Sequence, residues 1–303
     1  MSSLPEESYT DFTQGCLSDL ATLWGQFGIS ERQKFRKTYD DIASLISVPI
    51  EQLILRATLR FWDPFYRCFT FGKENLVPTI EEYSILMGID LQYLDKVYNK
   101  KPRAECRKVL ANILKVKPQI MDTYLVQKEN CQGLPWNILQ DFIRGHLHDE
   151  NVMVAFALAI YGLVIFPGIL GYIEMAVVDT FEQIQHGSNP SLTILAETFR
   201  SLNYCRRNQE WRFLGCAPLL YIWVRNHIFC ECITFTKSYF LGAAPIIEFC
   251  QNVLAHFLSG LFENFFFQFL FDGHVERQVS YIFLLAFPFR HPYLHKKFHR
   301  VLF

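Results

Sequence analysis

The sequence has no excess of charge of either sign. Its 29 Lys and Arg residues are balanced by 30 Asp and Glu residues, which gives a net charge of −1 over 303 residues. This balance excludes a global electrostatic attraction to nucleic acid or to an anionic membrane, so only a local patch can provide one. Apolar residues make up 50% of the chain and charged residues 19%, a composition that can form a sizeable buried core.

A secretory signal and a metal-type cysteine pattern are also missing. The polar residues 1–12 lack the basic start and the apolar run of a signal peptide. The nine cysteines are scattered, and the closest pair, Cys230 and Cys232, is separated by one residue instead of two. We therefore expect an intracellular protein, nuclear or cytoplasmic and not secreted, with reduced thiols and no metal site.

The common motifs that hold a cofactor or a catalytic group are absent. Gly72 and Lys73 are followed by Glu instead of Ser or Thr, so they do not form a phosphate-binding loop, and the sequence has no GxGxxG, GxSxG or HExxH. The acidic pairs at 40–41 and 81–82 are adjacent, so on a helix their side chains diverge by about 100° and do not share a site. We predict no catalytic, cofactor-binding or metal-binding residues and no enzymatic activity.

One long stretch has no charge at all. Residues 151–173, NVMVAFALAIYGLVIFPGILGYI, are numerous enough to cross a bilayer as a helix. Pro167, Gly168 and Gly171 break a helix in the second half of this stretch, and no basic cluster follows to set an orientation. We therefore predict that Val152–Ile165 is an internal helix covered by other helices, and a membrane span is the less favoured alternative.

Apolar residues recur at helical spacing along most of the chain. Leu17, Leu20, Leu23 and Phe27 form one such stripe. The same periodicity predicts helices at 47–59, at 106–114, from Trp136 past Ile143, at 191–203 and after Pro218. Residues 65–71 alternate instead and end at Gly72, which indicates a strand. The predicted fold is mainly α: a single multi-helix globular domain with at most a short extended segment around residues 65–71.

The most informative segment is residues 61–89, FWDPFYRCFTFGKENLVPTIEEYSILMGI. An aromatic-rich stretch ends at Gly72, and a helix begins at Pro78 and Thr79. Glu82 completes a capping box at the start of this helix.

The aromatic residues of this segment follow a turn signal. Asp63 before Pro64 indicates a turn or cap. Because burial of an aromatic ring removes a large area from water, we expect packing in the core instead of a ligand cage for five side chains: Trp62, Phe65, Tyr66, Phe69 and Phe71.

Segment 61–89 resembles the plant mobile domain, also called the aminotransferase-like plant mobile domain. Three later segments are similar to the same family: IYGLVIFPGILG, LAETFRSLNYCRR and RFLGCAPLLYIWVRNHI. The resemblance ends near Asn252 and implies one globular domain over residues 12–252. In this sequence the signature residues, to which we assign a structural role, are Phe61, Trp62, Asp63, Pro64, Tyr66, Phe69, Phe71, Gly72, Pro78, Thr79 and Glu82.

The resemblance implies an origin in mobile elements. On that basis we interpret the chain as a non-enzymatic, transposon-derived interaction module that acts in nuclear silencing or mobile-element biology with an unknown protein partner. The family name suggests an aminotransferase, but no lysine stands out as the site of a pyridoxal phosphate Schiff base. Two alternatives stay open: a hydrolase or nuclease-like enzyme with a dispersed site, and a decayed element without function.

A local run of positive charge carries the prediction of a nucleic-acid partner. Residues 96–117 hold eight basic residues and the single acid Glu105, with Tyr93 and Tyr98 close by. Basic side chains contact phosphates and aromatic rings stack on bases. The residues predicted to contact nucleic acid are Lys100, Lys101, Arg103, Arg107 and Lys108, and the alternative is a solvated helix face.

A second, smaller group of basic residues consists of Arg200, Arg206, Arg207 and Arg212. The acids Glu197 and Glu210 lie among them. Neutralisation of these two acids is the alternative to a contact with a partner.

Residues 253–303 differ in kind from the rest. They hold 12 of the 29 phenylalanines and 5 of the 9 histidines, a bias that the preceding residues do not share. We interpret this segment as a gene-model artefact, and the alternative is a divergent pair of C-terminal helices. His291, His295 and His299 recur every four residues, a spacing that can bind a metal on a helix, but Pro292 stands among them and favours a chance cluster.

Overall fold

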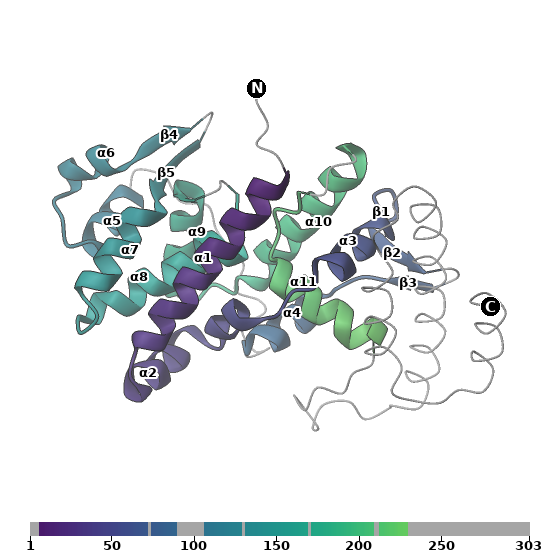
Figure 1. Cartoon of the computed structure of the whole chain (residues 1–303), viewed down its shortest axis with the longest axis horizontal. Coiled ribbons are helices and arrows are strands. Elements are labelled where there is room, and N and C mark those ends of the chain that lie inside the picture. The colour runs from purple at the N-terminus through teal and green to yellow at the C-terminus, as the bar shows by residue number, and fades with distance from the viewer. Residues whose placement is uncertain are drawn as a thin grey trace. The chain divides into compact units, whose positions relative to one another are not determined.

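Helices dominate the chain, and its two sheets are small (Figure 1). The computed structural model describes residues 6–71, 74–89, 106–128, 131–168, 171–208 and 212–229. Nearly all of these residues belong to one compact unit, Met1–Arg225. The mainly α fold class is thus confirmed. The predicted boundary at residue 252, the segment 253–303 with its histidines, and the pair Cys230 and Cys232 lie outside the described residues.

The helices of the first half are α1 (Glu6–Gln26), α2 (Ile29–Tyr39), the 3-10 helix η1 (Ile42–Ser47), α3 (Gln52–Arg60), α4 (Ile80–Met87), α5 (Cys106–Ile113), the 3-10 helix η3 (Pro118–Ile120) and α6 (Met121–Tyr124). Those of the second half are α7 (Trp136–Gly145), α8 (Glu150–Ile160), the π-helix η4 (Tyr161–Ile165), α9 (Met175–Gln185), α10 (Ser191–Asn208), α11 (Ala217–Val224) and the π-helix η5 (Arg225–Phe229).

Two antiparallel sheets of three strands interrupt the helices. The first contains β1 (Trp62–Asp63), β2 (Cys68–Phe71) and β3 (Glu74–Leu76), and the second contains β4 (Val126–Lys128), β5 (Cys131–Pro135) and β6 (Tyr172–Glu174). The extended segment expected around 65–71 is present only in its last four residues, as β2. The other strands were not expected, because runs of two to five residues are too short to show an alternating pattern.

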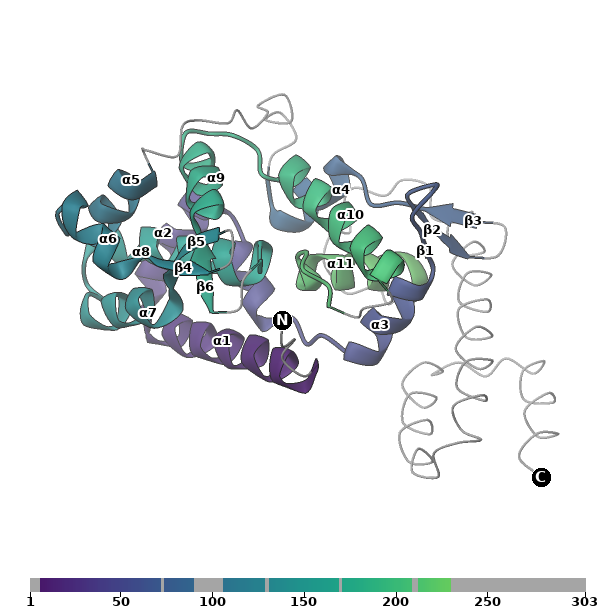
Figure 2. The ribbon, with the colours of Figure 1, turned by 90° about the horizontal axis from the view of Figure 1, so that it is seen from above.

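The uncharged stretch lies at the centre of the larger core. Helix α8 continues directly into η4, and every side chain from Ala155 to Phe166 is buried. Elements α1, α5, α7, α9 and η1 pack around it (Figures 1 and 2). The prediction of an internal helix at Val152–Ile165 is therefore confirmed. Among the described helices, none combines the length and the apolar character needed to cross a membrane.

The end of this central helix is packed closely against the second sheet. A Cβ atom added at Gly162 would lie 2.6 Å from Cγ1 of Ile173 in β6, so only glycine fits at this position without a shift of the Ile173 side chain. The helical geometry ends at Ile165, two residues before Pro167, as the sequence predicted.

A second core forms where segment 61–89 meets α10 and α11. The ring centroid of Trp62 lies 5.0 Å from that of Phe69 and 5.3 Å from that of Phe199. Phe69 in turn lies 5.7 Å from Trp223 of α11. Trp62, Phe69 and Phe71 are at most 1% exposed, as predicted.

The capping box predicted at the start of α4 is present. The hydroxyl oxygen of Thr79 accepts a hydrogen bond from the backbone N–H of Glu82 at 3.2 Å, and Oε2 of Glu82 accepts one from the backbone N–H of Thr79 at 2.9 Å. The same Oε2 also accepts a bond from Nε1 of Trp223 at 3.0 Å. The cap of α4 therefore also fixes α11, which the sequence did not indicate.

Candidate functional site

The turn between β1 and β2 is built by its first residue. Oδ1 of Asp63 accepts hydrogen bonds from the backbone N–H groups of Phe65 at 2.7 Å and Tyr66 at 3.0 Å. The backbone oxygen of Asp63 accepts a third bond, from the N–H of Arg67 at 2.8 Å, and Arg67 adopts a left-handed backbone with φ 56°. The prediction of a turn at Asp63 and Pro64 is confirmed, and these bonds restrict the turn to one conformation.

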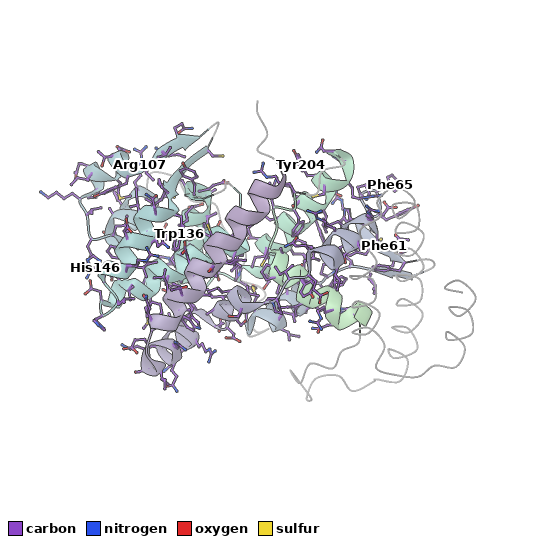
Figure 3. The ribbon with its side chains drawn as sticks, in the orientation of Figure 1. Phe61, Phe65, Arg107, Trp136, His146 and Tyr204 are labelled. Carbon is purple, nitrogen blue, oxygen red and sulfur yellow. The ribbon has the colours of Figure 1, made fainter. Side chains whose placement is uncertain are left out.

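This turn holds two aromatic side chains in solvent. Phe65 is 83% exposed and Tyr66 is 73% exposed, and their rings meet edge to face with centroids 5.0 Å apart. Phe65 lies at the margin of the described structure (Figure 3). The prediction that these two residues pack in the core is wrong. They lie in the turn beyond the last paired residues, Asp63 and Cys68, where the sheet can no longer direct them inward. The turn that Asp63 and Pro64 form, and not the aromatic character of the two residues, determines where these side chains lie.

The C-terminal half of α10 lies beside this turn. Nε1 of Trp62 in β1 donates a hydrogen bond to Oδ1 of Asn203 in α10 at 2.9 Å, and the Trp62 ring packs on Phe199. Two views of the ribbon show β1 next to this half of the helix (Figures 1 and 2). Tyr204, which follows Asn203, is 41% exposed. The buried tryptophan thus fixes the turn relative to the end of α10.

Exposed arginines lie in the turn and at the end of α10, the helix that contacts β1. Arg206 and Arg207 occupy the last turn of α10, and Arg67 ends the β1–β2 turn; all three side chains are exposed. Within the described part of the chain, no ion pair involves any of the three. Arg200 behaves differently, because its Nη2 pairs with Oε2 of Glu197 at 2.6 Å. Neutralisation of Glu197 is therefore observed, while Glu210 lies outside the described residues.

We call the set Phe65, Tyr66, Arg67, Tyr204, Arg206 and Arg207 the aromatic–arginine surface. It combines exposed rings, which can stack on a planar partner, with guanidinium groups, which can contact anions in a bidentate manner. The set contains no acidic side chain, and the nearest carboxylate of the turn, Asp63, already accepts two backbone hydrogen bonds.

The basic run predicted to contact nucleic acid is only partly described. Lys100, Lys101 and Arg103 lie outside the described residues, whereas Arg107 and Lys108 are exposed on α5. Nη1 of Arg107 lies 3.3 Å from Oδ1 of Asp122, so this side chain is engaged in an ion pair. Arg107 and Phe65 are at opposite ends of the described structure (Figure 3), so the basic run and the aromatic–arginine surface are separate features.

The residue that ends α2 has an unusual backbone conformation. Asp40 has φ 53° and ψ −148°, a backbone conformation that side chains other than glycine rarely adopt. Burial raises the pKa of its carboxyl group and also the pKa values of Tyr39 and Tyr161. The neighbouring Asp41 pairs with Arg36 at 3.3 Å. In the described ranges, no three His, Cys, Asp or Glu residues gather in a way that could hold a metal ion.

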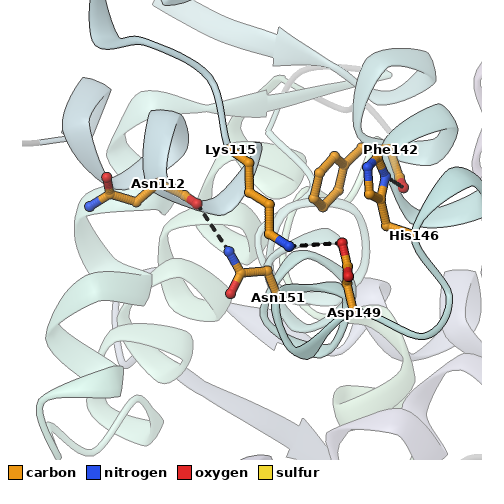
Figure 4. Close-up of polar contacts among 6 residues, drawn as sticks. All are labelled: Asn112, Lys115, Phe142, His146, Asp149 and Asn151. Atoms are coloured by element: carbon orange, nitrogen blue, oxygen red, sulfur yellow. Dashed lines mark hydrogen bonds and ion pairs between the residues drawn. The ribbon is translucent and has the colours of Figure 1, made fainter.

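A polar clamp joins the end of α5 to the start of α8 (Figure 4). Nζ of Lys115 donates to Oδ2 of Asp149 at 2.8 Å, and Nδ2 of Asn151 donates to the backbone oxygen of Asn112 at 3.1 Å. The hydrogen bond from Lys115 lowers the pKa of the Asp149 carboxyl group. Asn151 satisfies a carbonyl at the end of α5, so the clamp has a structural role.

The fold and its surface define a mainly helical domain that presents an exposed aromatic turn beside an arginine-bearing helix end. Residues 20–242 match the model of a family described as "Domain of unknown function (DUF7745)". The chain therefore belongs to the DUF7745 family. The match includes both the turn and α10. No curated protein and no solved structure matches the chain.

Proposed function

We propose that this DUF7745 domain is a non-enzymatic interaction module. The observation that carries this proposal is the turn after Asp63, which fixes two aromatic rings in solvent through three hydrogen bonds. Leaving a phenylalanine exposed forgoes about 1.5–3 kcal/mol of burial free energy. A turn built to hold such rings outside the core is suited to contact a partner, because exposed aromatic anchors dominate many interfaces.

The roles of the ionisable groups also support a binding function. Asp63 builds the turn and Glu82 caps α4, so these carboxylates serve the structure. Burial raises the pKa of the Cys16 thiol to about 11 and that of Cys216 to about 12, which keeps both thiols protonated at neutral pH. The resemblance to the plant mobile domain supports the further proposal that the module is transposon-derived and acts in the nucleus, in silencing or mobile-element biology.

The proposal is tested by the assembly state of the full chain in the cells that express it. A tagged chain is recovered under mild salt, and its complexes are sized by native mass measurement. We expect the wild-type chain to be part of a larger complex, and the double substitution Phe65→Ser with Tyr66→Ser to release it. Ile29→Ser is the matched control, because Ile29 is 79% exposed on a different helix. Recovery of the wild-type chain on its own would overturn the proposal.

A further inference from the structure

We propose, on the basis of the interaction function above, that the aromatic–arginine surface binds single-stranded nucleic acid. Unpaired bases stack on Phe65 and Tyr66, and backbone phosphates contact Arg67, Arg206 and Arg207. The inference depends on three observations: the presentation of the rings, the charge around them, and the link that holds both together.

The rings are presented in the way that base stacking requires. Phe65 and Tyr66 meet edge to face, with an interplanar angle of 87°, so the edge of one ring meets one face of the other and the remaining faces are not covered by this pair. At 83% and 73% exposure, both rings leave most of their surface open to a planar partner. The bases of a duplex already stack on one another, so only an unpaired base can use such a ring.

The charge around the rings matches a phosphate backbone. Arg67 follows Tyr66 directly, and its left-handed backbone is fixed by the bond to Asp63. Arg206 and Arg207 stand at the end of α10, and no described acid pairs with any of the three. Guanidinium groups that no acid of the described residues pairs with, together with exposed rings, form the combination that single-strand-binding surfaces use. The partner is therefore anionic and aromatic, and this description fits a nucleic acid better than an apolar peptide.

The two halves of the surface are held in fixed positions. The hydrogen bond of 2.9 Å from Trp62 to Asn203 joins β1, three residues before Phe65, to α10, one residue before Tyr204. Trp62 itself is 1% exposed, so the donor side of this bond is shielded from water. A prearranged surface loses less conformational entropy on binding than a flexible one, which favours affinity.

The test is a titration of the full chain into fluorescent oligonucleotides, followed by anisotropy. The probes are oligothymidylate and oligouridylate of about 15 nucleotides, which spans the site size of typical single-strand binders. A DNA duplex of equal length is a third probe. We expect both single strands to bind, and the duplex to bind at least about tenfold more weakly, because its bases are not free to stack. The tighter of the two single strands identifies the natural source as DNA or RNA.

Two double variants separate stacking from charge. Phe65→Ser with Tyr66→Ser removes the rings, and since each stacked base contributes about a fivefold to 150-fold gain in affinity, we expect at least about a tenfold loss. Arg206→Gln with Arg207→Gln removes two phosphate contacts. Its slope of log affinity against log salt should fall by about 1.4, since each contact to a single strand contributes about 0.7.

The controls are matched in exposure and in charge. Ile29→Ser removes an exposed apolar side chain, and Lys34→Gln with Lys37→Gln removes two exposed positive charges from α2. Neither should change affinity or salt slope. Circular dichroism of every variant checks that the fold is retained, which is expected because all substituted side chains are exposed.

Two results would overturn the inference. One is the absence of single-strand binding by the wild-type chain at about 50 mM salt, where phosphate contacts are strong. The other is an aromatic variant that binds as tightly as the wild type. If the cellular complex then survives nuclease treatment, the partner is another protein or a second copy of this chain, and the proposed interaction function stands without the nucleic acid. If the wild-type chain forms no complex in cells, both proposals fail.

Discussion

This domain has a central core around Val152–Ile165 and a second core where segment 61–89 meets α10 and α11, which we call the signature core. The two cores are stabilised in different ways. Around Val152–Ile165 the packing is mainly apolar, and the Phe156 ring centroid lies within 5.6 Å of the ring centroids of Trp24, Phe27 and Phe35. One ring at its edge, Trp136, donates a long hydrogen bond of 3.4 Å to Asp19. In the signature core, by contrast, large rings carry polar anchors. Trp62 donates to Asn203, Trp223 donates to Glu82, and Tyr221 donates to Glu51 at 3.1 Å.

This difference has consequences for function. Apolar packing depends on volume and tolerates rearrangement of similar side chains, whereas a hydrogen bond fixes the direction of a ring. The anchored rings hold β1, α4, α10 and α11 in one arrangement, and the exposed turn is an extension of that arrangement. We infer that the central core provides most of the stability and that the signature core provides the geometry of the surface.

The largest effect is expected from Phe156→Ala in the central core. The side chain is completely buried among three other rings, so its removal leaves a cavity and should lower the free energy of unfolding by about 3–5 kcal/mol. Phe156→Leu retains most of the side-chain volume and should lower the free energy of unfolding by clearly less. Denaturant unfolding of the full chain measures both values, and equal losses would contradict a volume-dominated core.

The second-largest effect is expected in the signature core. Trp223→Phe keeps most of the ring but removes the hydrogen bond to Glu82, and a bond to a charged group contributes about 1.5–3 kcal/mol. We expect the free energy of unfolding, measured with denaturant, to fall by about 2 kcal/mol. A double-mutant cycle with Glu82→Gln should show coupling between the two sites. Strictly additive losses would mean that the bond does not stabilise the signature core.

The features that the sequence predicted correctly are local ones. The capping box of Thr79 and Glu82 spans three residues, and the turn at Asp63 follows from two, so neighbouring residues were sufficient. The buried stretch at Val152–Ile165 was evident from its length without charge. For such features the physical cause lies within one or two helical turns of the chain.

The features that the sequence did not reveal depend on distant residues. The bond from Trp62 to Asn203 joins positions 141 apart, so no local pattern contains it. The tight approach of Gly162 to Ile173 depends on where β6 lies, and that strand has only three residues. The exposure of Phe65 and Tyr66 has a different cause: the turn at Asp63 is a local signal, and it determines the position of these rings more strongly than their apolar character does.

Asp40 at the end of α2 offers a test of backbone strain beside the central region. Its backbone conformation is one that glycine adopts freely, and for other residues such strain amounts to about 1–3 kcal/mol. Asp40→Gly should therefore raise the free energy of unfolding by about 1 kcal/mol, once the greater freedom of glycine in the unfolded chain is subtracted. Asp40→Ala retains the strain and serves as the control in the same denaturant measurement. A destabilised glycine variant would refute strain at this position.

The carboxyl group of Asp40 makes the free energy of unfolding depend on pH. Its pKa is raised in the folded state, so the folded chain binds the proton more tightly than the unfolded chain does. Stability is therefore lost as the pH rises from the unfolded pKa, about 3.9, through the raised folded value. Asp40→Asn has no such loss, so its unfolding free energy should exceed that of the wild type by more at neutral pH than at acidic pH.

The smallest effect is expected at the clamp between α5 and α8, which tests whether surface ion pairs contribute to the central core. The pKa of Asp149 is lowered by the hydrogen bond from Lys115. The contribution of this pair to folding stability is therefore present above the pKa of Asp149 in the unfolded chain, and it is lost as the pH falls through the pKa in the folded chain. Lys115→Gln should be slightly less stable than the wild type at neutral pH and equal to it in acid. Because both side chains are solvent-accessible, added salt should reduce the neutral-pH difference. Denaturant unfolding at two pH values and two salt concentrations measures this, and a difference that persists in acid would show that Lys115 acts through its backbone, at φ 54°, and not through its charge.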